Sequence, residues 1–439
     1  MERLSRRSFL ASSMATLGGI ALASCGGTAA SSNGPVTLRW SMWVSTPQEK
    51  AAWAALADNV KKAYPNITVN LETSAFDPYW DKLQTELASN TQADIIGMQG
   101  LRMPAFAARQ ALQPLQSDID KDKSVNIDDF YPPMRNMLSF KNQLYALPYD
   151  IGPIALYYNR DLFKAKGVAL PSPTTPMTWD EFRETALKLT DAKKHQYGYV
   201  ITPSFDAIVP WLWSGGADYM NSAETASTLD TPEALAALHF VMDLILKDKC
   251  AVPITDLSNA LFAAEQFYSG NVGMVMGAPY DAINIQANAK FKWDIIPIPA
   301  GKAGSVTRLS GSGFGISPHT QYPEQAWQAL KFITSTASLK QLAGVGRAYP
   351  ARSSATSAFL QPNAPEANIQ IFQKIVDGSV PNARGQFYRT TTTWQETEVM
   401  FTQEFNPIFL GLHSVEQIVA TVKPKFDALL QEHQSLIQK

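Results

Sequence analysis

Residues 36–43 read Val-Thr-Leu-Arg-Trp-Ser-Met-Trp, and they are the first of three β-rich stretches that decide the fold. A polar stretch follows, and residues 49–63 then show the apolar spacing of a helix. Residues 67–72 and 93–98 are two further predicted strands, with a helix that ends near Asn90 between them. Strands that alternate with helices predict an α/β fold with a mainly parallel sheet.

The same alternation resumes further along the chain. Residues 154–158 and 197–201 are predicted strands, and residues 179–190 between them are a predicted helix. A second α/β lobe therefore begins near residue 151. Residues 311–317 and the helix after them indicate a return to the first lobe. We predict a first lobe of residues 36–150 and 298–334, and a second lobe of residues 151–297 and 335–439.

The first 24 residues read as an export signal. Arg6 and Arg7 form a charged start, and residues 10–23 are a mostly apolar or small run that leads to Cys25. That run is too short to span a bilayer. The segment therefore predicts that the chain leaves the cytoplasm.

Two details of this segment predict how the protein is exported and anchored. Residues 5–10, Ser-Arg-Arg-Ser-Phe-Leu, resemble a twin-arginine signal, with the general export route as the alternative. Residues 22–25, Leu-Ala-Ser-Cys, resemble a bacterial lipobox, which would make Cys25 the lipidated N-terminus of the mature chain. Residues 25–35 are small and polar and suit a flexible tether. A plain signal or a transmembrane anchor is the other interpretation.

The composition is that of a globular protein without extreme charge. Hydrophobic residues make up 45% of the 439 residues and charged residues 17%, with a formal net charge of −2 at pH 7. This share of hydrophobic residues is enough to form large buried cores. The small net charge gives no reason to expect a nucleic-acid partner. Once Cys25 carries a lipid, Cys250 stands alone, so we expect no intramolecular disulfide and a fold held by its core.

No catalytic or metal-binding constellation stands out in the sequence. The five histidines are scattered without metal spacing, and neither a Gly-x-Ser-x-Gly elbow nor a Gly-x-x-x-x-Gly-Lys-Ser/Thr phosphate loop is present. We therefore expect no cofactor, no metal and no enzymatic activity. The rival hypothesis is a secreted carbohydrate-active enzyme, which would need two carboxylates on either side of a glycosidic bond.

Seven short motifs follow one another along nearly the whole mature chain. They are Tyr-Pro-Asn-Ile-Thr-Val (64–69), Tyr-Trp-Asp-Lys-Leu-Gln (79–84), Ala-Asp-Ile-Ile (93–96), Tyr-Ala-Leu-Pro (145–148), Leu-Tyr-Tyr-Asn (156–159), Thr-Trp-Asp-Glu-Phe (178–182) and Phe-Tyr-Ser-Gly-Asn-Val-Gly-Met (267–274). In their order and spacing they resemble the sugar-binding lipoproteins of ABC importers, the broad group that includes the maltose-binding protein.

The resemblance implies two lobes that are joined by hinge segments and close on a ligand. It places the chain crossings near Asp150, near residues 297–300 and near Thr334. It implies a monomer that binds a mono- or oligosaccharide and works with a membrane permease and a separate cytoplasmic ATPase. With the lipid anchor, it implies a location outside the cytoplasm, on the cell membrane.

Parallel sheets bind ligands beyond the carboxyl ends of their strands, so side chains at those ends are candidates. Trp43 ends the first strand and Tyr79 follows the second, and each can stack on a sugar ring. Trp40 and Trp80 occupy predicted core positions. Gln99 follows the third strand, where the family has a polar ligand contact. Core packing for the two aromatic residues and a surface amide for Gln99 are the alternatives.

Further candidates lie at the crossings and in the second lobe. A carboxylate at the first crossing can accept sugar hydroxyls or cap a turn, and a Gly-Ser pair can let backbone approach a ligand or form a tight turn. By resemblance, the family also places aromatic or polar groups in the second lobe and late in the chain. The candidates are Asp150, Trp211 with Trp213 as its alternative, Tyr280, Gly311, Ser312, Arg384 and Tyr388.

The class of ligand depends on the charge at these strand ends. A polyamine would require several carboxylates, and a glycerol phosphodiester or another anion would require cationic groups or helix N-termini. The predicted cleft instead combines aromatic residues and amides with few charges. This favours a neutral polyhydroxylated ligand, with a phosphodiester, a polyamine or a peptide as the alternatives.

The lipobox interpretation predicts that Cys25→Ala protein loses its membrane retention, because the residue that would carry the lipid is gone. Fractionation of cells into membrane and released protein measures this. Cys250→Ala leaves the signal segment intact and should stay with the membrane. A Cys25→Ala protein that still sediments with membrane would contradict the interpretation.

Overall fold

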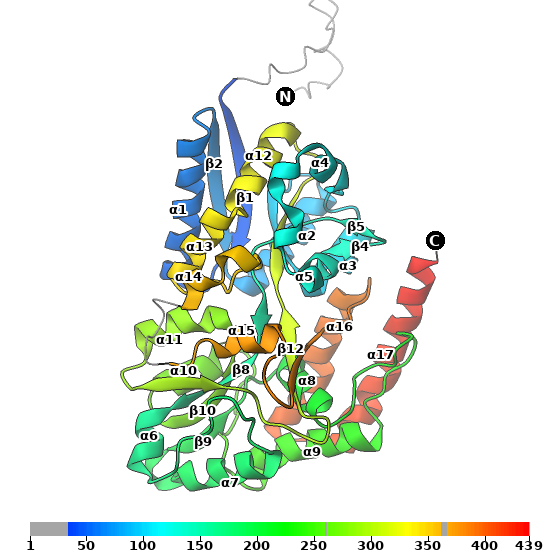
Figure 1. The fold of residues 1–439 in the computed structure, drawn as a ribbon. Coiled ribbons are helices and arrows are strands. Elements are labelled where there is room, and N and C mark those ends of the chain that lie inside the picture. The colour runs from blue at the N-terminus through cyan, green and yellow to red at the C-terminus, as the bar shows by residue number, and fades with distance from the viewer. Residues whose placement is uncertain (1–33, 260, 361–366, 439) are drawn as a thin grey trace, which may run out of the picture. The chain divides into compact units, whose positions relative to one another are not determined.

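The three strands predicted near the amino terminus lie side by side in one sheet (Figure 1). The structure is a computed structural model that describes residues 34–259, 261–360 and 367–438. β1 (Val36–Trp43) pairs in parallel with β2 (Ile67–Ser74) on one edge and with β3 (Ile95–Gln99) on the other. β13 (Ser312–Ile316) and β6 (Leu147–Pro148) complete the order β2-β1-β3-β13-β6. We call this the first sheet.

Helix α1 (Pro47–Ala63) covers this sheet and begins where capping chemistry predicts. The Thr46 hydroxyl accepts the backbone N–H of Glu49, and Pro47 occupies the first turn. On the buried face of the helix, the Trp53 ring meets the Trp40 ring of β1 edge-on, with centroids 5.8 Å apart. Such pairs add to the apolar area that they bury. The strand, the loop and the helix are therefore set by local sequence and secured by aromatic packing.

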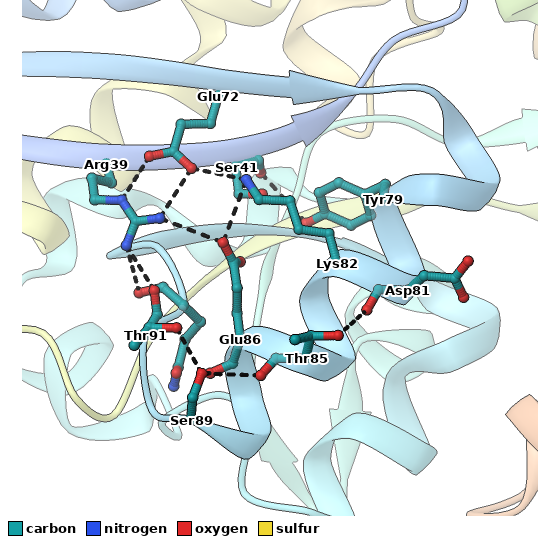
Figure 2. Close-up of polar contacts among 11 residues, drawn as sticks. Arg39, Ser41, Glu72, Tyr79, Asp81, Lys82, Thr85, Glu86, Ser89 and Thr91 are labelled. Atoms are coloured by element: carbon teal, nitrogen blue, oxygen red, sulfur yellow. Dashed lines mark hydrogen bonds and ion pairs between the residues drawn. The ribbon is translucent and has the colours of Figure 1, made fainter.

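A polar network on the outer side of the same sheet joins β1, β2 and α2 (Phe76–Ala88) (Figure 2). Arg39 Nε lies 2.6 Å from Glu72 Oε1, and Arg39 Nη2 lies 3.5 Å from Glu86 Oε1. Lys82 Nζ contacts both carboxylates, at 3.0 and 3.4 Å. Single exposed ion pairs contribute about 0–1 kcal/mol, but a network fixes geometry better than a lone pair does. These contacts hold β2 and α2 in register with β1.

A second sheet has the order β11-β8-β10-β9. Its strands are β8 (Ala155–Asn159), β9 (Tyr197–Val200), β10 (Val272–Gly277) and β11 (Trp293–Ile296). β9 and β10 are parallel, but β8 is antiparallel to both of its neighbours. β13 likewise runs against β3 in the first sheet. The predicted α/β class is confirmed, but both sheets are mixed, because β8 and β13 each run antiparallel to their neighbours.

A third sheet, which we call the connecting sheet, has the order β14-β12-β7. β7 (Gly152–Pro153) leads into β8, and β12 (Ser305–Ser310) leads through Gly311 into β13. A Cβ at Gly311 would lie 2.4 Å from the Asp150 carbonyl oxygen, so only glycine fits between the two passing segments. The chain therefore crosses between the first sheet and the connecting sheet twice, and the two crossings lie against each other at Asp150 and Gly311. β14 (Ala383–Phe387) pairs in parallel with β12.

The remaining elements are short connections and helices that cover the sheets. Figure 1 shows α1, α12 and α13 around the first sheet, and α6 and α7 around the second. They are α3 (Met103–Ala108), α4 (Gln116–Lys121), α5 (Pro132–Met137), β4 (Ser139–Phe140), β5 (Gln143–Leu144), α6 (Arg160–Ala165), α7 (Trp179–Leu189), α8 (Phe205–Ser214), α9 (Pro232–Leu246), α10 (Phe262–Tyr268), α11 (Ala282–Asn288), α12 (Pro323–Ile333), α13 (Thr336–Gly344), α14 (Ser357–Leu360), α15 (Ile371–Val376), α16 (Trp394–Met400) and α17 (Val415–Ile437).

The lobe boundaries stay a prediction, and two contacts lie close to them. The Ala300 carbonyl accepts the N–H of Trp179 at the start of α7. Ala300 was predicted for the first lobe, whereas α7 was predicted for the second. Gln341 of α13 was predicted for the second lobe, but it accepts a hydrogen bond at 2.9 Å from Asn59 of α1, which was predicted for the first. The export signal, Cys25 and the tether to residue 33 lie outside the described residues. Among the described helices, none is both long and apolar enough to cross a bilayer.

We expect Trp53→Ala to lower the free energy of unfolding by about 3–5 kcal/mol, because a buried aromatic side chain is lost and a cavity remains. Trp53 has no exposed surface, and its ring also meets Phe314 and Tyr149 edge-on. Urea denaturation measures the change. Lys50→Ala, an exposed change in the same helix, should stay within about 0.5 kcal/mol of the wild type. Equal losses in the two variants would contradict the packing argument.

Candidate functional site

A cavity of about 440 Å³ opens where the first sheet, the second sheet and the connecting sheet meet. Trp43 ends β1 and Gln99 ends β3, and both side chains line this cavity. Strand ends of an α/β sheet are the expected place for a ligand. The cavity brings together six of the ten predicted ligand-binding residues, namely Trp43, Gln99, Asp150, Tyr280, Gly311 and Ser312.

Trp43 is held in place by other aromatic rings. It is 7% exposed, and its ring centroid lies 5.3 Å from that of Tyr79 and 5.8 Å from that of Phe76. Tyr79 is outside the lining, and its hydroxyl donates to the Gly97 carbonyl at 2.7 Å. Figure 2 shows its ring pointing toward Ser41 of β1. Burial raises the pKa of that hydroxyl well above its ordinary value. Tyr79 therefore supports Trp43 from within the core.

Asp150 lies at the point where the chain passes between sheets. Its Oδ1 accepts the backbone N–H of Ser312 at 2.7 Å. Burial raises the pKa of the carboxyl group to about 7, and the nearby Arg347 guanidinium only partly opposes this effect. The carboxyl group can therefore take both protonation states near neutral pH. It can accept a hydrogen bond from a ligand in either state and donate one when protonated.

Two buried arginines line the cavity, and each has a carboxylate beside it. Arg347 Nε lies 3.8 Å from Glu49 Oε2, and its guanidinium lies over the Trp53 ring. Arg308 Nη2 lies 3.1 Å from Asp206 Oδ2. Both arginines are at most 5% exposed. Each pair is close to electrically neutral, although Arg308 Nε and Arg347 Nε have no hydrogen-bond partner within the described part of the chain.

Asp281 and Tyr280 form the opposite part of the lining, after β10. Asp281 Oδ2 accepts the N–H of Ala278 at 2.8 Å. Burial raises the pKa of Asp281 to about 6. Burial likewise raises the pKa of the Tyr280 hydroxyl well above its ordinary value, so it stays a neutral donor and acceptor. The lining thus offers an aromatic face and a carboxyl group next to each other.

Four predicted residues do not line this cavity. Besides Tyr79, Trp211 is 1% exposed and its ring packs against Trp179 and Phe240. Its alternative, Trp213, donates its indole N–H to Asp218 at 2.9 Å and is also outside the lining. Arg384 on β14 is exposed and donates to the Ala303 carbonyl at 3.1 Å.

The fourth, Tyr388, lines a smaller neighbouring cavity of about 220 Å³. Its ring centroid lies 5.9 Å from the Arg308 guanidinium carbon, so this side chain touches the wall between the two cavities.

Sequence reasoning missed the charged residues of the lining, where few charges were expected. They are Glu49, Asp206, Asp281, Arg308 and Arg347. Local signals existed for some of them, since Glu49 lies in the first turn of the helix after β1 and Arg308 lies three residues before Gly311. Arg347 offers no such signal, because it follows α13 in a segment that tertiary packing alone brings to Asp150.

The described residues include no group of three or more His, Cys, Asp or Glu side chains arranged to hold a metal. Cys250 is a free, buried thiol, and burial raises its pKa to about 12. It therefore packs as a small apolar side chain. The chemistry that the cavity does offer is stacking on aromatic faces and hydrogen bonding to carboxyl, guanidinium, amide and hydroxyl groups.

We expect Asp150→Asn to change the pH dependence of stability. The folded protein holds the Asp150 proton more tightly than the unfolded chain, whose carboxyl group has a pKa near 3.8. This stabilisation is present below about pH 4 and is lost as the pH rises through about 7. The variant should therefore gain stability relative to the wild type between pH 4 and 7, by at most about 1.4 kcal/mol per pH unit.

Urea denaturation at pH 4, 5.5 and 7 measures the difference. Asp58→Asn, which removes an exposed carboxylate of α1 and leaves the cavity intact, is the control. Parallel curves for Asp150→Asn and the wild type would show that Asp150 is not the buried group described.

The chain matches the bacterial extracellular solute-binding proteins over residues 44–340. A binding protein of Brucella abortus is 27% identical over 393 residues, which cover 85% of this chain and 90% of the relative. The arabinooligosaccharide-binding protein of Halalkalibacterium halodurans is 26% identical over 281 residues, which are 61% of each chain.

Among solved structures, the ABC substrate-binding protein from Listeria monocytogenes in complex with cycloalternan superposes with a TM-score of 0.83. It is 21% identical, and the match covers 90% of this chain and 99% of that one. This likeness confirms the predicted two-lobe α/β fold. Because the family match spans more than half of the chain, this protein belongs to the bacterial extracellular solute-binding proteins, as the order of its motifs predicted.

Proposed function

We propose that this protein binds a carbohydrate in the cavity between its sheets and delivers it to the membrane permease of an ABC importer, driven by a separate ATPase. The observation that carries the proposal is the cavity lining, where the Trp43 and Tyr280 rings lie among buried carboxyl and guanidinium groups. A sugar has apolar C–H faces and a rim of hydroxyls, and this lining has partners for both.

The charge balance of the lining favours a neutral ligand. Glu49 lies beside Arg347 and Asp206 beside Arg308, so these four charges largely cancel. Asp150, with a pKa raised to about 7, is about half protonated near neutral pH, whereas Asp281, with a pKa of about 6, is mostly ionised there. A phosphodiester would find a carboxylate beside each of these arginines, and a polyamine would find few carboxylates without a cationic partner.

Binding is the whole task of the protein in this proposal, and the chain acts as an exported monomer. The lipid at Cys25 would keep it near the permease, and the tether of residues 25–35 would let it reach the permease. The family is one of binding proteins, and a relative from Streptomyces antibioticus is named as a lipoprotein. The proposal therefore joins a soluble binding unit to a membrane through its amino terminus alone.

Sugar binding should raise the melting temperature, because a ligand that binds only the folded state stabilises it. Melting curves with a panel of mono- and oligosaccharides measure this, with glycerophosphocholine, spermidine and a short peptide as comparison ligands. A rise with one of the comparison ligands and with no sugar would overturn the carbohydrate assignment.

We expect Tyr280→Ala to weaken binding of the responding sugar roughly fivefold or more, because one aromatic face is lost from the lining. Calorimetric titration measures the change. Tyr322→Ala replaces a half-buried tyrosine outside the lining and should leave the affinity unchanged. Equal affinities in all three proteins would remove Tyr280 from the site.

A further inference from the structure

Gln99 is held by an arginine that lies three residues further along the chain. Arg102 ends the short 3-10 helix η1 (Gly100–Arg102) that follows β3, and it lies outside the lining of the main cavity. Its Nε–H donates to Gln99 Oε1 at 3.3 Å. A guanidinium has donors only, so the Gln99 amide must turn its oxygen toward Arg102. The amide nitrogen of Gln99, with its two N–H groups, is left for other partners.

Arg102 is itself fixed by its surroundings. It is 9% exposed, and its guanidinium lies over the Trp80 ring at 4.3 Å and over the Phe76 ring at 5.5 Å. Its Nη2 lies 2.7 Å from Glu398 Oε2, on α16. A side chain that is locked by packing and by an ion pair can hold a neighbouring group in one geometry. Arg102 is therefore suited to hold the Gln99 amide in one orientation.

The same arginine also contacts the support of the aromatic face. The Trp80 ring beneath its guanidinium lies 5.3 Å from the Trp43 ring, centroid to centroid. Trp43 and Gln99 end neighbouring strands and both line the main cavity. Arg102 thus contacts Gln99 directly and Trp43 through Trp80. A ligand that stacks on Trp43 would have the free N–H groups of Gln99 beside it.

We propose that Arg102 is a positioning residue that turns the Gln99 amide so that its N–H groups donate to an oxygen atom of the ligand. This inference rests on the proposed carbohydrate function and assigns the direction of one hydrogen bond within it. Glu398 takes part by fixing Arg102. The amide is then oriented before the ligand arrives, so binding does not have to immobilise it. The ligand must present a hydroxyl or ring oxygen at the end of β3.

Gln99→Glu tests the direction of the hydrogen bond. An ionised glutamate has nearly the same shape as glutamine and can pair with Arg102, but it accepts hydrogen bonds and donates none. The probes are glucose, lactose, maltose and arabinotriose, and the one that binds the wild type most tightly is used in calorimetric titration. We expect Gln99→Glu to bind it at least about tenfold more weakly. Binding as tight as that of the wild type would overturn the donor role of Gln99.

A second set of variants tests whether Arg102 acts through Gln99. Arg102→Met/Glu398→Gln removes both charges of the ion pair, because Arg102→Met alone would leave the Glu398 carboxylate without its partner. We expect a loss of affinity of about fivefold. Addition of the same two changes to Gln99→Leu should cause no further loss, because the amide that Arg102 holds is already gone. Arg102→Lys keeps a cationic donor and should restore part of the affinity.

Arg109→Met is the matched control. Arg109 follows α3, its Nη2 lies 2.5 Å from Glu396 of α16, and it lines neither cavity. It therefore joins the same two parts of the chain as Arg102 does, without a contact to Gln99, and its variant should bind the sugar as the wild type does. Melting temperatures without ligand establish that the variants fold. If the paired change unfolds the protein, Arg102→Lys with and without Gln99→Leu provides the same comparison.

The outcomes separate this inference from the carbohydrate function. Losses that multiply when the Arg102 and Gln99 changes are combined would show that Arg102 does not act through Gln99. An equal loss in Arg109→Met would show that the contact with α16, and not the orientation of the amide, matters. Either result overturns the positioning role and leaves carbohydrate binding standing. No binding of any of the four saccharides by the wild type would overturn both.

Discussion

The molecule depends on the place where two passing segments of chain touch. The Asp150 carboxyl accepts the N–H of Ser312, and Gly311 lies so close to the Asp150 carbonyl that a side chain there would clash. Both segments connect the first sheet to the connecting sheet, and both line the ligand cavity. A third segment joins this contact, because the Ile151 N–H donates to the Tyr349 carbonyl. The ligand cavity is therefore built onto the place where the chain passes between the sheets.

Burial at this joint explains the electrostatics of the cavity. Moving a charged group out of water costs free energy, and the structure lowers this cost in two ways. Arg308 and Arg347 keep their charge beside Asp206 and Glu49, whereas Asp150 has a pKa raised to about 7. The result is a lining rich in hydrogen-bonding groups in which both arginine charges are balanced by carboxylates. Such a lining suits hydroxyl groups better than ions.

The sequence predicted correctly the site residues that lie at the ends of strands. It predicted poorly the residues whose side-chain orientation depends on tertiary packing. Trp43 and Gln99 were predicted because they end strands of a sheet whose direction the βα alternation reveals, and both line the cavity. Tyr79 and Trp211 also had plausible positions, but their rings turn into the core. Whether an aromatic ring faces a ligand or its own core depends on one rotation of a helix or strand, which periodicity does not resolve.

The sequence by itself determined the order of strands and helices, the family and the strand ends at which a ligand would bind, because these follow from local apolar spacing, capping residues and motif order. Only the tertiary structure decided which distant groups meet there. Arg347 reaches Asp150, and Trp394 and Phe401 reach the neighbourhood of Gln99, across separations that no local pattern encodes. It also decided that β8 and β13 run antiparallel to their neighbours, because strand direction depends on the side from which the chain enters each sheet.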